Sequence, residues 1–182
     1  MRELSLHIMD VIENGINAGA TLITLLVSED RNENQLRIII SDNGKGIPEE
    51  LMDKVMDPFY TTRTTRRVGL GLSLFREASK RCEGQFSLHS SEGKGTEVSA
   101  SFRLDHIDMA PMGDLTGSLT CLIMGNPGVD FLYRHEVGDK SFEIDTRLIR
   151  EELEGVPINN PGVIKFLTDK ISESLRELKE SN

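Results

Sequence analysis

The stretch Leu36–Pro48 reads L-R-I-I-I-S-D-N-G-K-G-I-P, and the rest of the chain is interpreted from it. Its first half is a short β-branched run closed by turn residues, which predicts a strand buried on at least one face. Asp42 follows at the carboxyl end of that strand. A carboxylate there can accept a hydrogen bond from an exocyclic amine such as that of adenine, and Gly44 and Gly46 lack Cβ atoms that would hinder a flat base. The alternative is a β-hairpin, because Asn-Gly between two extended segments is a strong turn signal.

The composition is that of an ordinary soluble globular chain. Of its 182 residues, 37% are hydrophobic and 28% are charged, which indicates one domain or one domain with an appendage. No apolar run reaches the roughly 18 residues of a membrane span, and the first ten residues do not resemble a signal peptide. We therefore expect a cytoplasmic protein that does not bind membranes.

The net charge of −9 argues against a nucleic-acid-binding protein, which would usually have a basic surface. Most of this charge lies in residues 105–182, which places a boundary near Leu104. Cys82 and Cys121 are far apart and have no metal-binding spacing, so we expect two buried thiols rather than a disulfide or a zinc site.

A first helix is predicted over residues 5–18, where apolar residues recur at helical spacing. Asp10, Asn14 and Ala18 are each four residues apart, so they share one face of that helix. Mg²⁺ takes oxygen ligands and keeps several waters, so one amide oxygen together with substrate phosphates would suit it. The alternative is that these polar residues only face solvent.

A basic segment without any acidic residue lies between residues 58 and 76. Three arginines are concentrated in it, and Gly69 and Gly71 lead into a helical pattern. Backbone N–H groups at a helix start bind anions, so this segment predicts a phosphate site. An exposed basic loop with a glycine hinge is the alternative.

A glycine-rich turn, Glu92–Thr96, separates two alternating strand patterns and predicts a hairpin. Thr96 would lie where its hydroxyl can help to hold Asp42 or the base.

In their order along the chain, these motifs resemble those of the ATP-binding superfamily of gyrase, heat-shock chaperones, histidine kinases and mismatch-repair ATPases (GHKL, the Bergerat fold). The motifs are Asn14, Asp42-Asn43-Gly44-Lys45-Gly46, Gly69-Leu70-Gly71-Leu72 and Gly93-Lys94-Gly95-Thr96. The stretch D-P-F-Y-T-T-R with G-L-G-L-S-L is similar to the kinase branch, and I-E-N-G-I-N-A-G-A is similar to mismatch-repair proteins. The resemblance covers residues 5–104.

The resemblance implies an α+β fold, a two-layer sandwich in which helices cover one face of a mixed β-sheet and ATP lies between helix and sheet. Residues 1–104 would form the histidine-kinase-like ATP-binding domain, and residues 105–182 a small acidic α+β extension. By the same resemblance, Asn14 would bind Mg²⁺ and Asp42 the adenine amine. The other implied ATP-binding residues are Ala18, Gly44, Gly46, Ile47, Thr62, Arg63, Gly69, Leu70, Gly71, Leu72 and Thr96, with Thr61–Arg67 as a short lid.

The chain departs from the family pattern in two places. In the hydrolysing branches, a glutamate four residues before the magnesium-binding asparagine is the general base, and here that position is Asp10, one methylene shorter. Asp10 is therefore the candidate catalytic residue. Histidine kinases carry a phosphoacceptor histidine on a helical hairpin before this domain, whereas His7 lies inside the first predicted helix. We expect His7 to be structural and the phosphoacceptor to lie on another chain.

Residues 105–182 predict a linker, an apolar helix over 114–124, a hairpin of strands 129–137 and 141–144, a helix over 146–154, and a last helix from Asn160 or Pro161. The apolar stripe of the last helix serves either as a homodimer seam or for packing on the protein's own core.

Two functions remain open. One is a Mg²⁺-dependent kinase or ATPase of a signal-transduction type. The other is a non-hydrolysing, ATP-responsive module, similar to an anti-sigma-factor regulator, that binds a protein partner through the extension or the lid. A scaffold without nucleotide binding is disfavoured because no pocket position is damaged.

Overall fold

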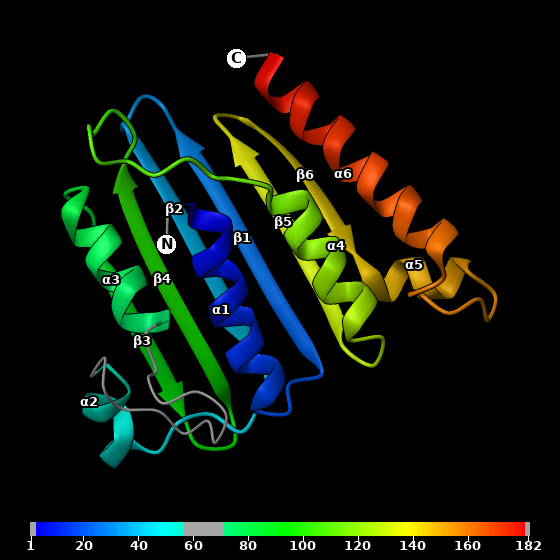
Figure 1. Cartoon of the computed structure of the whole chain (residues 1–182), viewed down its shortest axis with the longest axis horizontal. Coiled ribbons are helices and arrows are strands. Elements are labelled where there is room, and N and C mark those ends of the chain that lie inside the picture. The colour runs from blue at the N-terminus through cyan, green and yellow to red at the C-terminus, as the bar shows by residue number, and fades with distance from the viewer. Residues whose placement is uncertain (1–2, 57–70, 181–182) are drawn as a thin grey trace.

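The computed structural model describes residues 3–56 and 71–180, which form one six-stranded mixed sheet with helices packed on one face (Figure 1). The strands are β1 (Leu22–Asp30), β2 (Gln35–Asp42), β3 (Phe86–Ser91), β4 (Gly95–Arg103), β5 (Asp130–Val137) and β6 (Lys140–Asp145). The helices are α1 (Leu4–Asn17), α2 (Met52–Val55), α3 (Gly71–Arg81), α4 (Leu115–Gly125), α5 (Thr146–Glu152) and α6 (Pro161–Glu180), with the 3₁₀-helix η1 (Glu49–Leu51). The predicted α+β sandwich is confirmed.

The strands follow the order β3-β4-β2-β1-β5-β6 across the sheet. β1 and β5 are parallel, and the other neighbouring pairs are antiparallel. Because side chains alternate between the two faces of a strand, every second residue points into the helix layer and is buried. These core residues include Ile23, Leu25, Val27, Leu36, Ile38, Ile40, Val98, Ala100, Phe102, Phe131 and Tyr133. β2 pairs with β1 and β4 rather than folding back after Asp42, so Asn43-Gly44 does not join a hairpin.

The helix layer is centred on α1, which contacts both α3 and α4 and lies between them in Figure 1. Its buried apolar residues recur at helical spacing, as the sequence predicted. His7 belongs to the buried side of α1, where its ring stacks on that of Phe75 with 5.3 Å between the centroids. Burial lowers the pKa of His7 to about 4, so the side chain is neutral and has the structural role expected of it.

Residues 105–182 continue the same sheet and the same helix layer. β5 pairs with β1 along its whole length. The segment before α4 is held against the start of α1, where the N–H of Leu4 donates to Pro111 O at 3.0 Å and the N–H of Ser5 donates to Met112 O at 2.8 Å. These bonds satisfy amides that have no partner inside the helix. The division of the chain near residue 104 stays a prediction, because the sheet runs across it.

The last helix, α6, packs its apolar stripe on the protein's own core. Val163, Leu167 and Ile171 are buried, and α6 contacts α4, β5 and β6. Of the two uses predicted for the stripe, the structure therefore shows packing within the chain.

The two cysteines differ in exposure. Cys82 is buried as predicted, but Cys121 is exposed on α4, so the prediction of two buried thiols is wrong for Cys121. The apolar neighbours Leu119, Leu122 and Ile123 occupy the buried side of α4, and position 121 faces outward. Among the helices that the structure describes, none combines the length and the apolar character needed to cross a membrane.

Candidate functional site

Three of the predicted nucleotide-binding segments meet at one end of the sheet. α1 and β2 end there and β4 begins there. In the sheet register, Asp42 lies opposite Ile23 on one side and Thr96 on the other. α1 lies so close to this point that a Cβ built on Gly15 would be 2.8 Å from the Cβ of Asp42. Strand pairing and helix packing thus bring together residues that are far apart in the sequence.

The carboxylate of Asp42 is held by two backbone N–H groups. Its Oδ1 accepts the N–H of Gly44 at 2.8 Å. The backbone N–H of Thr96 also donates to the carboxylate. The hydroxyl of Thr96 lies 2.8 Å from that of Ser90, and it is the backbone N–H of Thr96 that donates to Asp42. The predicted contact of the Thr96 hydroxyl with the base stays a prediction. The side chain of Asp42 is half-buried, and this burial raises the pKa of the carboxyl above its ordinary value.

The raised pKa of Asp42 predicts a pH-dependent difference in stability. Because burial raises the pKa, the folded chain binds this proton more tightly than the unfolded chain does. The stability that this group contributes is fully present at acid pH and is lost as the pH rises through the pKa of the folded state. We expect the free energy of unfolding of the parent chain, relative to Asp42→Asn, to be lower at about pH 7 than at about pH 4 in urea titrations. The opposite trend would contradict the burial of this carboxyl.

The loop that follows β2 is packed between α1 and the β3–β4 hairpin. The N–H of Lys45 donates to Ala18 O at 3.0 Å. A Cβ on Gly46 would overlap with the carbonyl oxygen of Ser91, and a Cβ on Gly44 would be 3.0 Å from that of Ala18. Both glycines therefore have a packing reason to lack a side chain, and their contact with a base stays a prediction.

Gly15 and Ser90 also shape the site, although neither was predicted to do so. The Ser90 hydroxyl accepts the N–H of Ile47 at 2.9 Å and donates to Gly95 O at 2.8 Å, so it joins the glycine loop to the hairpin. A glycine in the middle of a helix costs about 1 kcal/mol relative to alanine, and this cost was a usable signal for Gly15. Ser90 offered no such signal, because it lies in a strand with several other serines.

The predicted phosphate side of the site lies between α1 and the start of α3. A Cβ built on Gly71, the first residue of α3, would be 3.2 Å from the Cβ of Asp10 and 3.4 Å from its Oδ2. Asn14 and Ala18 follow at four-residue intervals on the same face as Asp10. Leu72 is partly buried against the core. The predicted residues Thr62, Arg63, Gly69 and Leu70, and the rest of the lid Thr61–Arg67, lie outside the described residues.

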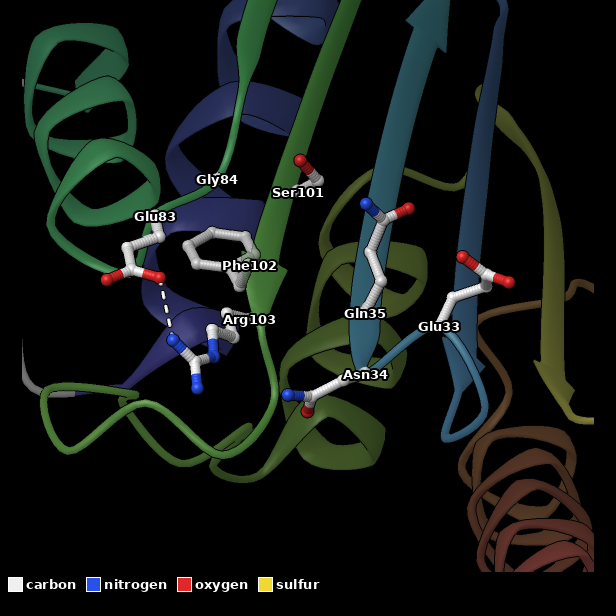
Figure 2. Close-up of a pocket in the computed structure, with 8 residues that line it drawn as sticks. All are labelled: Glu33, Asn34, Gln35, Glu83, Gly84, Ser101, Phe102 and Arg103. Carbon is white, nitrogen blue, oxygen red and sulfur yellow. Dashed lines mark hydrogen bonds and ion pairs between the residues drawn. The ribbon is translucent and has the colours of Figure 1, made fainter.

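A separate polar pocket of about 270 Å³ lies at the opposite end of the sheet (Figure 2). It is lined by Glu33, Asn34, Gln35, Glu83, Gly84, Ser101, Phe102 and Arg103. Arg103 donates to Glu83 at 2.8 Å and to Asp105 at 2.7 Å, so its charge is already paired. β2 spans about 23 Å from Gln35 to Asp42, so this pocket is not part of the predicted nucleotide site.

Comparison with known families matches residues 2–106 to the family described as histidine kinase-, DNA gyrase B- and HSP90-like ATPase. A putative sensor protein of Shewanella frigidimarina is 31% identical over 109 residues, which cover 59% of this chain and 17% of that protein. Sensor protein kinase WalK of Staphylococcus haemolyticus is 32% identical over 106 residues, which cover 54% of this chain and 17% of that protein. Sporulation kinase C of Bacillus subtilis is 30% identical over 88 residues, covering 48% and 20%. The chain thus matches a fifth or less of the length of these relatives.

Two solved structures share the fold. The ATPase domain of Aquifex aeolicus MutL, complexed with ADP, superposes with a TM-score of 0.51 at 14% identity, covering 85% of this chain and 68% of that one. The N-terminal domain of a DNA repair protein gives a TM-score of 0.52 at 18% identity, and the match covers 80% of this chain and 52% of that one. The family match spans more than half of the chain, and the observed sandwich agrees with it. The chain therefore belongs to the family of histidine kinase-, DNA gyrase B- and HSP90-like ATPases.

Proposed function

We propose that this chain binds ATP at the end of the sheet where α1, the loop after β2 and the start of β4 meet. The observation that carries the proposal is the half-buried carboxylate of Asp42, held by the backbone N–H groups of Gly44 and Thr96. A carboxylate oriented in this way can accept from the exocyclic amine of adenine, whereas guanine presents a carbonyl oxygen at the same position of its ring. The ADP bound to the MutL ATPase domain supports an adenine nucleotide for this fold.

Mg²⁺ is the metal that these residues would suit. Within residues 3–56 and 71–180, no three His, Cys, Asp or Glu side chains are grouped to hold a metal ion. Mg²⁺ needs no such cage, because it is usually held by one or two protein oxygens together with substrate phosphates and water. The carboxamide of Asn14 would supply the protein oxygen. When bound, the ion neutralises phosphate charge that would otherwise oppose transfer of the terminal phosphoryl group.

Asp10 is the proposed general base for hydrolysis or phosphoryl transfer to a protein. Its carboxylate lies against Gly71 at the start of α3, where the phosphates are expected because backbone N–H groups at a helix start bind anions. A base at this point can take the proton from a water or hydroxyl that attacks the terminal phosphate, provided that it is within hydrogen-bond reach.

The second candidate function is an ATP-responsive interaction module in signal transduction that binds nucleotide without useful turnover. It is favoured by the length of the Asp10 side chain, which is one methylene shorter than the glutamate of the hydrolysing branches. The partner would be a protein bound by residues 105–182 or by the lid, or a second copy of this chain. The concentration of negative charge in residues 105–182 supports a role for them in partner binding.

One experiment separates the two functions. Purified protein is incubated with γ-labelled ATP and Mg²⁺, and free phosphate and protein-bound label are followed beside calorimetric binding. We expect ATP binding that weakens when Mg²⁺ is chelated and that no longer depends on Mg²⁺ in Asn14→Ala. Turnover that falls at least tenfold in Asp10→Ala, with ATP binding retained, would identify an enzyme. Binding without turnover would identify the module, and a parent chain that does not bind ATP would overturn both proposals.

A further inference from the structure

Asn43, the residue between Asp42 and Gly44, joins the nucleotide loop to the beginning of β1. Its Oδ1 accepts the N–H of Thr21 at 2.8 Å and that of Leu22 at 2.9 Å. Its Nδ2 donates to Thr21 Oγ1 at 2.9 Å, and its own N–H donates to Leu22 O at 3.3 Å. The segment that carries Asp42 is therefore fixed in place by Thr21 and by Leu22, the first residue of β1.

Thr21 is in turn bonded to the C-terminal extension. The N–H of Asp130, the first residue of β5, donates to Thr21 O at 2.9 Å. The carboxylate of Asp130 accepts from Arg150 Nε at 2.7 Å and from Thr146 Oγ1 at 3.1 Å. Arg150 also donates from Nη2 to Pro127 O at 2.8 Å. α5 and the turn before β5 are thus tied through Asp130 to the residue that holds Asn43.

We propose that Asp130 and Arg150 are positioning residues for the nucleotide site, acting through Thr21 and Asn43 on Asp42. The inference rests on the ATP binding proposed above, and it makes residues 105–182 part of the support of the base-binding loop. A binding group must be held within about 0.5 Å of its productive position. Because Asp42 is the last paired residue of β2, the position of its carboxylate also depends on what holds the next residue. Here that residue is Asn43, whose side chain bonds to Thr21 and Leu22, and Thr21 O in turn accepts the N–H of Asp130 in the extension.

The cluster around Asp130 is sheltered enough to act as a fixed support. The side chains of Arg150 and Asp130 are 32% and 29% exposed, and Thr146 is fully buried. The Thr146 hydroxyl also accepts the N–H of Phe131 at 2.8 Å, which fixes it to the backbone of β5. Hydrogen bonds to charged groups, such as those to the carboxylate of Asp130, contribute more to stability than bonds between neutral groups.

Arg134, which lies on β5 together with Asp130, provides a matched control for Arg150. Its Nε donates to Glu136 at 2.7 Å, the same distance as the Arg150–Asp130 pair. Arg134 lies opposite Leu26 in the sheet register, in the middle of β1 and away from Thr21. Arg134→Ala therefore removes a comparable ion pair without touching the proposed support.

The test compares the affinities for ATP and for GTP, each with Mg²⁺, by calorimetry. Partial unfolding lowers the affinities for ATP and for GTP by the same factor, whereas displacement of Asp42 lowers only the preference for ATP. The ratio of the two affinities therefore distinguishes a loss of positioning from a loss of stability. We expect the ratio to fall about tenfold in Asn43→Ala and about threefold in Arg150→Ala, and to stay unchanged in Arg134→Ala. Asn43→Asp keeps acceptor oxygens for the N–H groups of Thr21 and Leu22, and should restore most of the ratio.

The combined variant Asn43→Ala/Arg150→Ala should lose no more of the ratio than Asn43→Ala does, because Arg150 acts through Asn43. Unchanged ratios in both single variants, with a parent chain that prefers ATP, would overturn this inference and leave the proposed function standing. A parent chain that does not bind ATP would overturn both. If Arg150→Ala does not fold, Arg150→Lys keeps one donor for Asp130 without the bond to Pro127, and the parent ratio in that variant would overturn the role of Arg150.

Discussion

Asp42→Asn should abolish ATP binding while leaving the fold intact. The N–H of Gly44, which donates to Oδ1 of the carboxylate, would donate to the amide oxygen of asparagine in the same way. The amide nitrogen then takes the place of the second carboxylate oxygen, and a donor faces the donor amine of adenine. A polar group left unpaired in a partly buried site costs about 1–3 kcal/mol, and two opposed donors lie at the upper end of that range. We therefore expect ATP binding to weaken at least about a hundredfold.

The measurement is calorimetric titration with ATP, beside thermal unfolding followed by circular dichroism. The melting temperature should not fall, because the substitution removes the cost of holding a charge in a half-buried position. Asp139→Asn is the matched control, since it makes the same change in charge at an exposed residue of the β5–β6 turn, and it should bind ATP as the parent chain does. Parent affinity in Asp42→Asn, or an equal loss in both variants, would remove Asp42 from the adenine site.

The sequence could predict much of this site because its signals are local. A β-branched run with Asp42 and two glycines shortly after it indicates a strand end, and four-residue spacing places Asp10 and Asn14 on one helix face. Each of these inferences needs only a few neighbouring residues. The structure bears out the elements that they require, namely α1 and β2.

Contacts between distant segments could not be predicted in the same way. Ser90 bonds to Ile47, which lies 43 residues earlier, and nothing about a serine in a strand indicates such a partner. The alternating pattern of residues 129–144 predicted a hairpin correctly, but strand patterns do not specify neighbours. The parallel pairing of β5 with β1, and with it the bond from Asp130 to Thr21, required the three-dimensional arrangement.

Gly95→Ala should destabilise the chain by more than about 3 kcal/mol and weaken ATP binding with it. Gly95 begins β4 with a φ of 88°, a left-handed conformation that costs an L-residue about 1–2 kcal/mol. A Cβ at this position would also overlap with the carbonyl oxygen of Asp42. The new Cβ would be fixed to the backbone of β4, and the carbonyl oxygen belongs to the backbone of β2. Because these strands are paired, neither atom can move away without weakening the pairing of Asp42 with Thr96. Urea unfolding measures the loss of stability, and calorimetry measures the loss of ATP affinity.

Gly93→Ala is the control that isolates the contact with Asp42. Gly93 lies two residues earlier in the same turn and also has a left-handed φ, of 75°. A Cβ built there would meet no heavy atom of the described residues within 4 Å, so alanine carries only the conformational cost of about 1–2 kcal/mol. This variant should therefore keep its affinity for ATP. The difference between the two variants in free energy of unfolding measures the stability that depends on the close contact between Gly95 and the end of β2. Equal destabilisation by both would mean that the hairpin can withdraw from Asp42, and that the N–H of Thr96 does not hold the carboxylate in place.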